Sequence, residues 1–174
     1  MKTKTYNIKI ETNENPQTPP SPEEQKHLGF GKIFTNHMFI MNYDAPEGWH
    51  DPRIIPYQAI PLDPAAMIFH YGQAVFEGMK AYRQPDGSIS LFRPQRNFER
   101  INRSAERMGI PPLDPELAYE ALVTLIKQDA EWVPSEPGTS LYIRPFIMAT
   151  EVGLGVRTAQ HYVFVIILSP SGNF

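Results

Sequence analysis

Apolar and polar residues follow two different periods along this chain, with polar, proline-rich segments between them. Alternation of apolar and polar residues is typical of a half-buried strand, whereas apolar residues three and four apart form one face of a helix. The alternating segments predict strands within residues 6–11, 34–43, 79–92 (a hairpin), 139–148 and 161–168. The helical period predicts two helices, one beginning at Pro94 and one capped by Asp114. Together these elements predict an α+β fold, a mostly antiparallel sheet with two helices packed on one face.

Turn and cap residues place the boundaries of these elements. Residues 84–87 have the chemistry of a hairpin turn, because proline presets φ and Asp-Gly tolerates the left-handed region. Pro94 suits the first turn of a helix, where no amide donor is needed. The predicted buried faces are Phe98, Ile101, Ala105 and Met108 in the first helix, and Leu117, Ala121, Leu122, Leu125 and Ile126 in the second. Two short extended pieces are predicted in a proline-rich region, at residues 53–55 and 57–60.

The last predicted strand bears on the domain organisation. Residues 162–168 are apolar on both faces, so this strand needs cover on both sides. Two helices cover only one face, and we expect the other face to be bare without a large second domain that is absent from this chain. Residues 1–29, rich in proline and polar side chains, are expected to form an arm or linker. Residues 30–174 are expected to form one small domain.

Composition argues against several classes of partner. The formal net charge of −3 gives no electrostatic reason to expect nucleic acid or an anionic membrane. No apolar run approaches the ~20 residues that span a bilayer. The chain has no cysteine, which excludes disulfides and thiolate metal sites, and its five histidines show no ligand spacing, so no metal is expected. No apolar secretory segment follows Met1, so a cytoplasmic location is expected.

The stretch 70–82 differs from ordinary core sequence. Gly72 and Gly78 bracket a short apolar piece, and glycine lets the backbone adopt positive φ or approach another group closely. From Met79 the pattern alternates, which indicates a strand leaving a loop, and such loops often carry ligand-contacting side chains. A buried corner filled with aromatic residues fits the same pattern equally well.

Arginines supply the candidate chemistry, because the guanidinium fork suits phosphate and carboxylate groups. Four of them form one stripe on the first helix: Arg96, Arg100, Arg103 and Arg107. A solvated charged face is the stronger interpretation of that stripe. Arg144 is a better candidate, because an arginine within an apolar strand needs an anion or access to a cleft; a structural ion pair fits it equally well. Composition and spacing lead no further than a sheet domain with an anion-binding cleft.

Several motifs in a fixed order carry a resemblance. They are His70-Tyr71-Gly72, Phe76-Glu77-Gly78-Met79-Lys80, Phe92-Arg93-Pro94, Thr139-Ser140-Leu141-Tyr142-Ile143-Arg144-Pro145 and Gly153-Leu154-Gly155-Val156. From about Phe30 onward the sequence resembles the branched-chain amino acid aminotransferases, which are class IV, fold type IV enzymes that depend on pyridoxal phosphate. The resemblance covers the N-terminal small domain of that family.

The resemblance implies roles for seven residues. Arg100 matches the arginine that binds the cofactor phosphate, and Arg144 matches the arginine that receives the distal carboxylate of glutamate. Five more match the aliphatic substrate pocket, the last two by reaching into the pocket of the other subunit of a homodimer: Phe30, Phe76, Tyr142, Tyr71 and Val156.

The implied activity is transfer of an amino group between leucine, isoleucine or valine and 2-oxoglutarate, with pyridoxal phosphate as cofactor. The resemblance places the Schiff-base lysine in the large domain, beyond Phe174, and none of the seven lysines here matches it, so this chain alone is expected to be inactive. Two alternatives stay open. One is another class IV enzyme, such as a D-amino acid transaminase or aminodeoxychorismate lyase, and the other is a non-catalytic binding or dimerisation domain.

Overall fold

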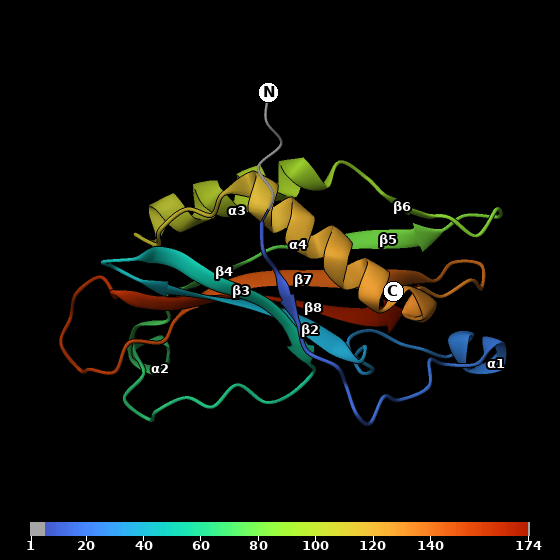
Figure 1. Cartoon of the computed structure of the whole chain (residues 1–174), viewed down its shortest axis with the longest axis horizontal. Helices are drawn as coiled ribbons and strands as arrows, with labels where there is room; N and C mark the ends of the chain where they lie inside the picture. The colour runs from blue at the N-terminus through green and yellow to red at the C-terminus, as the bar shows by residue number, and fades with distance from the viewer. Residues whose placement is uncertain (1–5, 174) are drawn as a thin grey trace.

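The computed structural model describes residues 6–173, and its centre is one curled sheet of eight strands (Figure 1). The strands are β1 (Lys9–Ile10), β2 (His37–Asp44), β3 (Gly48–Pro56), β4 (Ala74–Phe76), β5 (Met79–Arg83), β6 (Ile89–Leu91), β7 (Ser140–Ala149) and β8 (His161–Ser171). They lie in the order β1-β3-β2-β8-β7-β5-β6, and β4 also pairs with β7. The β1–β3 pair is parallel and the other strand pairs are antiparallel. The predicted fold class is confirmed.

Two long helices, α3 (Pro94–Arg107) and α4 (Pro115–Gln128), cover one face of the sheet (Figure 1). Their buried residues match the prediction: Phe98, Ile101, Ala105, Leu117, Ala121, Leu122, Leu125 and Ile126. Met108 does not, because α3 ends at Arg107 and Gly109 turns the chain with a φ of 66°, leaving Met108 40% exposed. Shorter turns are α1 (Pro22–Gln25), α2 (Met67–Tyr71) and η1 (Ala130–Trp132). Within residues 6–173, no helix is long and apolar enough to cross a membrane.

The opposite face of the sheet carries a second, smaller core, which corrects one expectation. This cluster consists of Met38, Ile40, Ile55, Val163 and Val165. Ile60 packs against it from the proline-rich segment that passes below the sheet in Figure 1. Residues 162–168 of β8 are all buried except Ile167, which is half-buried. The prediction that one face of this strand would be bare is therefore wrong, because this chain itself supplies the cover.

The predicted strands on either side of Asp44 were only partly right. Residues 53–55 lie within β3, which confirms the first of the two short extended pieces. β2 begins at His37, three residues later than expected, and β3 begins at Gly48, forming a hairpin with β2 that was not predicted. The prolines obscured the first part of this strand, yet β3 tolerates them because only two of its residues pair with β1 on its outer side. Residues 57–60 lie outside the strands that the structure describes and belong to the segment below the sheet.

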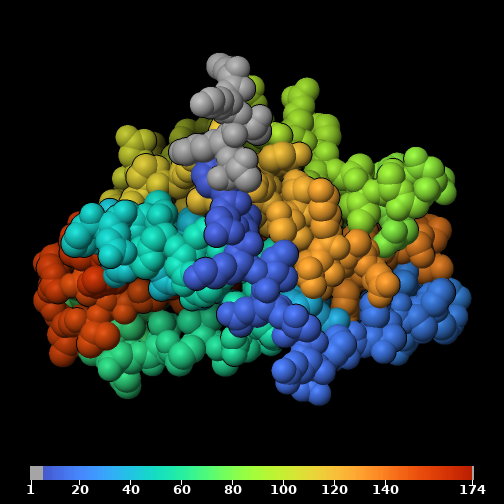
Figure 2. Space-filling view, viewed as in Figure 1, coloured from blue at the N-terminus to red at the C-terminus, as the bar shows by residue number. Residues whose placement is uncertain are grey.

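The N-terminal arm packs along the domain, as the blue atoms in Figure 2 show. β1 pairs with Arg53 and Ile54 of β3, which confirms a short edge strand within residues 6–11. Further along the arm, Leu28 is only 3% exposed. Residues 1–5 of the predicted arm lie outside the described residues.

Candidate functional site

The alternation along β7 directs two candidate residues to the face opposite the long helices. Leu141 and Ile143 are fully buried in the core with α3 and α4, whereas Tyr142 and Arg144 face the other way and are half-buried. Successive side chains of a strand point to opposite faces, so this placement follows from the sequence. β4 and β5 both pair with β7, and Phe76, the last residue of β4, lies opposite Phe146 of β7, which places its ring against Arg144.

Arg144 lies against two aromatic rings and has no carboxylate partner among residues 6–173. Its Cζ atom is 4.5 Å from the centroid of the Phe76 ring and 5.3 Å from that of the Tyr142 ring. Its Nη2 donates a hydrogen bond of 2.9 Å to the Tyr142 hydroxyl, while its buried Nε has no partner in the described part of the chain. A buried donor left unpaired costs about 1–3 kcal/mol. The position therefore suits an anionic ligand better than a structural ion pair.

Tyr142 is held between Phe30, Gly78 and Arg144. The Phe30 and Tyr142 rings meet edge to face with centroids 4.8 Å apart. A Cβ atom on Gly78 would lie only 2.3 Å from the Tyr142 hydroxyl oxygen, so the absence of a side chain there makes room for this hydroxyl. The structure therefore brings together four of the predicted pocket residues, Phe30, Phe76, Tyr142 and Arg144.

Arg100 forms a two-bond fork with Glu77, on the turn after β4. Its Nε and Nη2 donate to the two carboxylate oxygens at 2.5 and 2.7 Å. Burial raises the pKa of Glu77, whereas hydrogen bonds from Arg100, Asn97 and the Gly78 amide lower it. The hydrogen bonds outweigh burial, so the pKa of Glu77 lies below its ordinary value. The hydrogen bonds to Glu77 raise the pKa of Arg100. Both groups are charged at neutral pH, and the Arg100 side chain is still 60% exposed.

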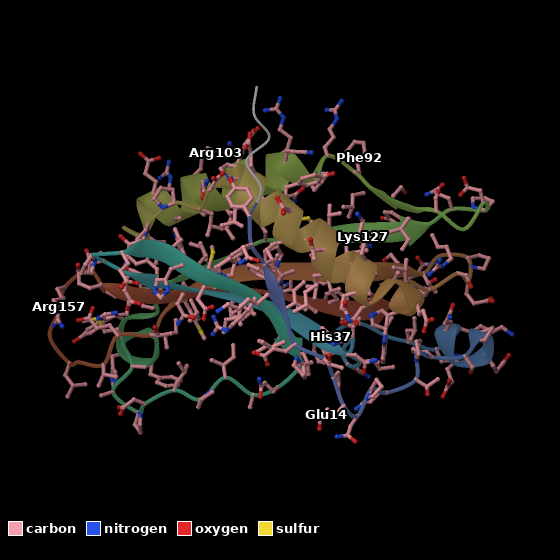
Figure 3. The ribbon with its side chains drawn as sticks, in the orientation of Figure 1. Glu14, His37, Phe92, Arg103, Lys127 and Arg157 are labelled. Atoms are coloured by element: carbon pink, nitrogen blue, oxygen red, sulfur yellow. The ribbon has the colours of Figure 1, made fainter. Side chains whose placement is uncertain are left out.

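The other arginines of the helical stripe behave as a solvated face. Arg96 pairs with Glu99 in the same helix at 2.8 Å, and these side chains are 75% and 42% exposed. Arg103, labelled in Figure 3, and Arg107 are exposed. No role for Glu77 was predicted, because its partner Arg100 is 23 residues away and no local spacing links the two.

The other two predicted pocket residues lie elsewhere in the fold. Tyr71 is in α2, and Val156 is on the loop between β7 and β8. Tyr71, the last residue of α2, donates to the carbonyl oxygen of Leu154 at 2.5 Å. The Gly153 amide donates to the carbonyl of Ala65 at 3.0 Å. These bonds attach the loop to α2 and to the residues just before it, while Leu154 and Val156 are 66% and 87% exposed.

Two concave surfaces lie near the sheet edge formed by β5 and β6. One, of about 340 Å³, adjoins the site and is lined by Gly78, Met79, Lys80, Tyr82, Phe92, Asn97 and Tyr142. The other, of about 590 Å³, is lined by residues of β6, the start of α3 and α4, including Lys127, and holds none of the predicted site residues. Figure 3 labels Phe92 and Lys127 for orientation. Geometry therefore favours the smaller depression as part of the site.

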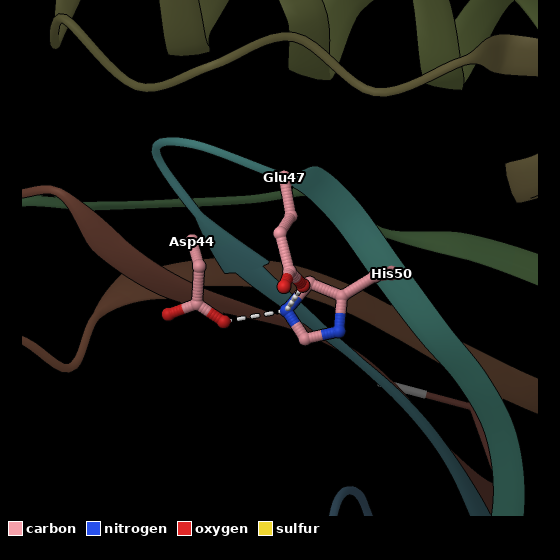
Figure 4. Close-up of side chains that lie close together, drawn as sticks. All are labelled: Asp44, Glu47 and His50. Atoms are coloured by element: carbon pink, nitrogen blue, oxygen red, sulfur yellow. Dashed lines mark hydrogen bonds and ion pairs between the residues drawn. The ribbon is translucent and has the colours of Figure 1, made fainter.

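Asp44, Glu47 and His50 form a group of potential metal ligands at the β2–β3 turn (Figure 4). His50 Nε2 lies 2.5 Å from Asp44 Oδ2, and His161 Nδ1 contacts the other Asp44 oxygen. These two hydrogen bonds, His50 first, lower the pKa of Asp44. These hydrogen bonds explain why the side chains lie close together, so their proximity does not by itself indicate a metal site.

The site has one arginine held by a carboxylate and a second packed against two aromatic rings. The small α+β fold that carries it is of the class found in the small domain of aminotransferases. Structure comparison agrees. The branched-chain aminotransferase of Thermoproteus uzoniensis, solved with norvaline, matches with a TM-score of 0.58 and 25% identity over 75% of this chain and 40% of that one. The Escherichia coli branched-chain amino acid aminotransferase matches with a TM-score of 0.56 over 78% and 40%, and its 22% identity supports the fold alone.

Sequence comparison narrows the class. Branched-chain-amino-acid transaminase 1 of Bacillus subtilis is 58% identical over 147 residues, which are 84% of this chain and 41% of the relative. Branched-chain-amino-acid aminotransferase 2 of the same organism is 51% identical over 167 residues, 96% of this chain and 45% of the relative. No protein-family model matches. This chain is therefore a relative of the branched-chain amino acid aminotransferases over their N-terminal part, and it spans less than half of their length.

Proposed function

We propose that the complete protein is a pyridoxal phosphate-dependent transaminase that moves the amino group between leucine, isoleucine or valine and 2-oxoglutarate. The high identity to branched-chain aminotransferases supports this activity over another class IV enzyme or a binding domain. One observation on this chain carries the proposal: the Arg144 guanidinium lies against two rings with a buried Nε that no described residue satisfies.

The two halves of the reaction impose opposite demands on one pocket. Leucine brings an aliphatic side chain, whereas glutamate brings a second carboxylate, so the pocket needs apolar walls and one reachable cation. Phe30, Phe76 and Tyr142 supply the walls in our proposal. Arg144 supplies the cation, and its packing between rings keeps it in place when the aliphatic substrate is bound.

Arg100 fits the phosphate of the cofactor. Glu77 occupies its Nε and Nη2, and its Nη1 makes none of the described hydrogen bonds. Since its side chain is 60% exposed, this nitrogen can meet a phosphate oxygen. When bound, pyridoxal phosphate supplies an electron sink for chemistry at the substrate Cα. In our proposal the residues of this chain bind and orient the cofactor and the substrate. We assign the proton-transferring lysine to a large domain in the part of the complete protein that this chain does not span.

Assembly as a homodimer is part of the proposal. The loop after β7 presents Leu154 and Val156, which are 66% and 87% exposed, and Tyr71 fixes that loop through the Leu154 carbonyl. Exposed apolar side chains gathered on one surface favour association. We assign these residues to the pocket of the second subunit, and the protein to the cytoplasm.

The amino-donor profile of the complete protein tests this function. We expect glutamate to form from 2-oxoglutarate with leucine, isoleucine or valine as donor, and no comparable rate with D-alanine. A preference for D-alanine would assign the protein to the D-amino acid transaminases. Absence of transfer from any of these donors by cofactor-loaded protein would contradict the proposal outright.

A further inference from the structure

Glu77 makes more hydrogen bonds than a surface ion pair requires. Its side chain is 5% exposed, and it accepts from Arg100 Nε and Nη2, from Asn97 Nδ2 at 3.1 Å and from the Gly78 amide at 3.3 Å. Asn97 also donates to the Gly78 carbonyl at 3.3 Å, which ties α3 to the turn between β4 and β5. Asn97 and the Gly78 amide therefore hold the Glu77 carboxylate in place independently of Arg100.

A second pair on the same helix shows what an ordinary surface pair looks like. Arg96 and Glu99 share one described hydrogen bond, and both side chains are well exposed. Such pairs contribute little, because solvent screens them and both side chains lose freedom. Arg100 instead meets a buried carboxylate through two parallel bonds, and a planar guanidinium held by two bonds has its direction fixed.

The fork has two opposing consequences for an anion at Arg100. The negative charge of Glu77 weakens the attraction of the site for a phosphate. The fixed plane, however, aims the remaining nitrogen, Nη1, in one direction and lowers the entropy lost when a ligand binds. If charge alone mattered, neutralising Glu77 would strengthen phosphate binding; if orientation dominates, it would weaken it.

We propose that Glu77 is the positioning residue for Arg100, and that orientation outweighs the charge it cancels; this inference rests on the assignment of Arg100 to the cofactor phosphate. The end of β4 and the turn that follows it contact both ends of the site. Phe76 packs on the Arg144 guanidinium, Glu77 holds Arg100, and Gly78 leaves room for the Tyr142 hydroxyl. Three consecutive residues thus connect the phosphate end to the carboxylate end.

The test compares binding of pyridoxal phosphate and of pyridoxal, which lacks the phosphate, to the complete, cofactor-free protein. The readout is the dissociation constant of pyridoxal divided by that of pyridoxal phosphate, which measures how much the phosphate contributes to binding. This readout needs no turnover. We expect Glu77→Gln to reduce this ratio by about 10- to 100-fold, by analogy with the loss seen when a residue that orients a metal ligand is replaced. Glu99→Gln is the matched control and should leave the ratio unchanged. Asn97→Ala should change it in the same direction as Glu77→Gln, but less, and replaces that variant if it does not fold.

The outcomes separate this inference from the function on which it rests. If Arg100→Ala lowers the ratio but neither Glu77→Gln nor Asn97→Ala does, the positioning role is wrong and the cofactor assignment stands. If Arg100→Ala leaves the ratio intact, the phosphate assignment itself fails. Equal weakening of both ligands in Glu77→Gln would mark a structural role only, and tighter pyridoxal phosphate binding would show that charge dominates. Each of these last two results overturns the inference.

Discussion

Replacing Gly78 by alanine should damage the Arg144 site without touching Arg144. The ideal Cβ would lie 2.3 Å from the Tyr142 hydroxyl oxygen and 3.1 Å from its Cζ, against an ordinary contact of 3.4–4 Å. The hydroxyl must therefore retreat by about 1 Å. Phe30 packs against the Tyr142 ring, and Arg144 donates to its hydroxyl at 2.9 Å, so the retreat strains this hydrogen bond. The Gly78 backbone adds no strain, because its φ is not among the positive values.

The magnitude follows from the bond that is lost. A hydrogen bond involving a charged group contributes about 1.5–3 kcal/mol, equivalent to about 10- to 150-fold in rate or affinity. We expect kcat/KM for 2-oxoglutarate to fall within that range in Gly78→Ala, measured by steady-state kinetics on the complete protein. The midpoint of thermal unfolding should change little, since Tyr142 is only half-buried.

A double-mutant cycle checks the cause. Tyr142→Phe removes the oxygen that the new Cβ would meet, so Gly78→Ala should cost much less in that background. Additive effects of the two substitutions would refute the steric argument.

Three further predictions concern other parts of the chain. Arg100→Ala should release cofactor on dialysis of the complete protein, whereas Arg107→Ala, on the same helical stripe, should retain it. Equal retention in the two variants would show that Arg100 is part of the solvated face and does not bind the phosphate. Asp129→Ala should lower the free energy of unfolding in urea by about 3 kcal/mol, because it strips the buried His37 ring of its 2.7 Å partner; a loss below about 1 kcal/mol would contradict this. Because hydrogen bonds lower the folded-state pKa of Asp44, its contribution to stability is present above its ordinary pKa and disappears as pH falls. Unfolding free energy should therefore fall less steeply below about pH 5 in Asp44→Asn, and parallel curves would show that the carboxylate contributes nothing.

The regular parts of this fold were predictable because local chemistry determines them. Pro94, Asp114 and the apolar stripes define α3 and α4, and the turn at residues 84–87 defines the β5–β6 hairpin. Only residues 53–55 of β3 were predicted, because Pro52 and Pro56 normally argue against a longer strand, and only its position near the sheet edge permits them. The cover over β8 was missed because Ile60 lies about 100 residues from Val163 in the chain, and no periodic pattern reports such a contact.

The candidate site divides in the same way. The period of two put Tyr142 and Arg144 on one face, so their proximity could be predicted. The partnership of Glu77 with Arg100 could not, because four arginines share one helical spacing and only the tertiary fold brings a buried carboxylate to one of them. The room that Gly78 leaves for Tyr142 likewise joins two segments 64 residues apart, which no local motif encodes.

The selectivity of Arg144→Ala is the most direct test of the proposed function. In the complete protein, the aliphatic side chain of leucine makes no use of the cation, whereas the distal carboxylate of glutamate loses a charge-assisted hydrogen bond. We predict that kcat/KM for glutamate falls by about 10- to 150-fold more than that for leucine. The exposed Arg96→Ala variant should change neither value. Equal losses for leucine and glutamate in Arg144→Ala would contradict the role of Arg144 and, with it, the proposal that one pocket accepts both substrates.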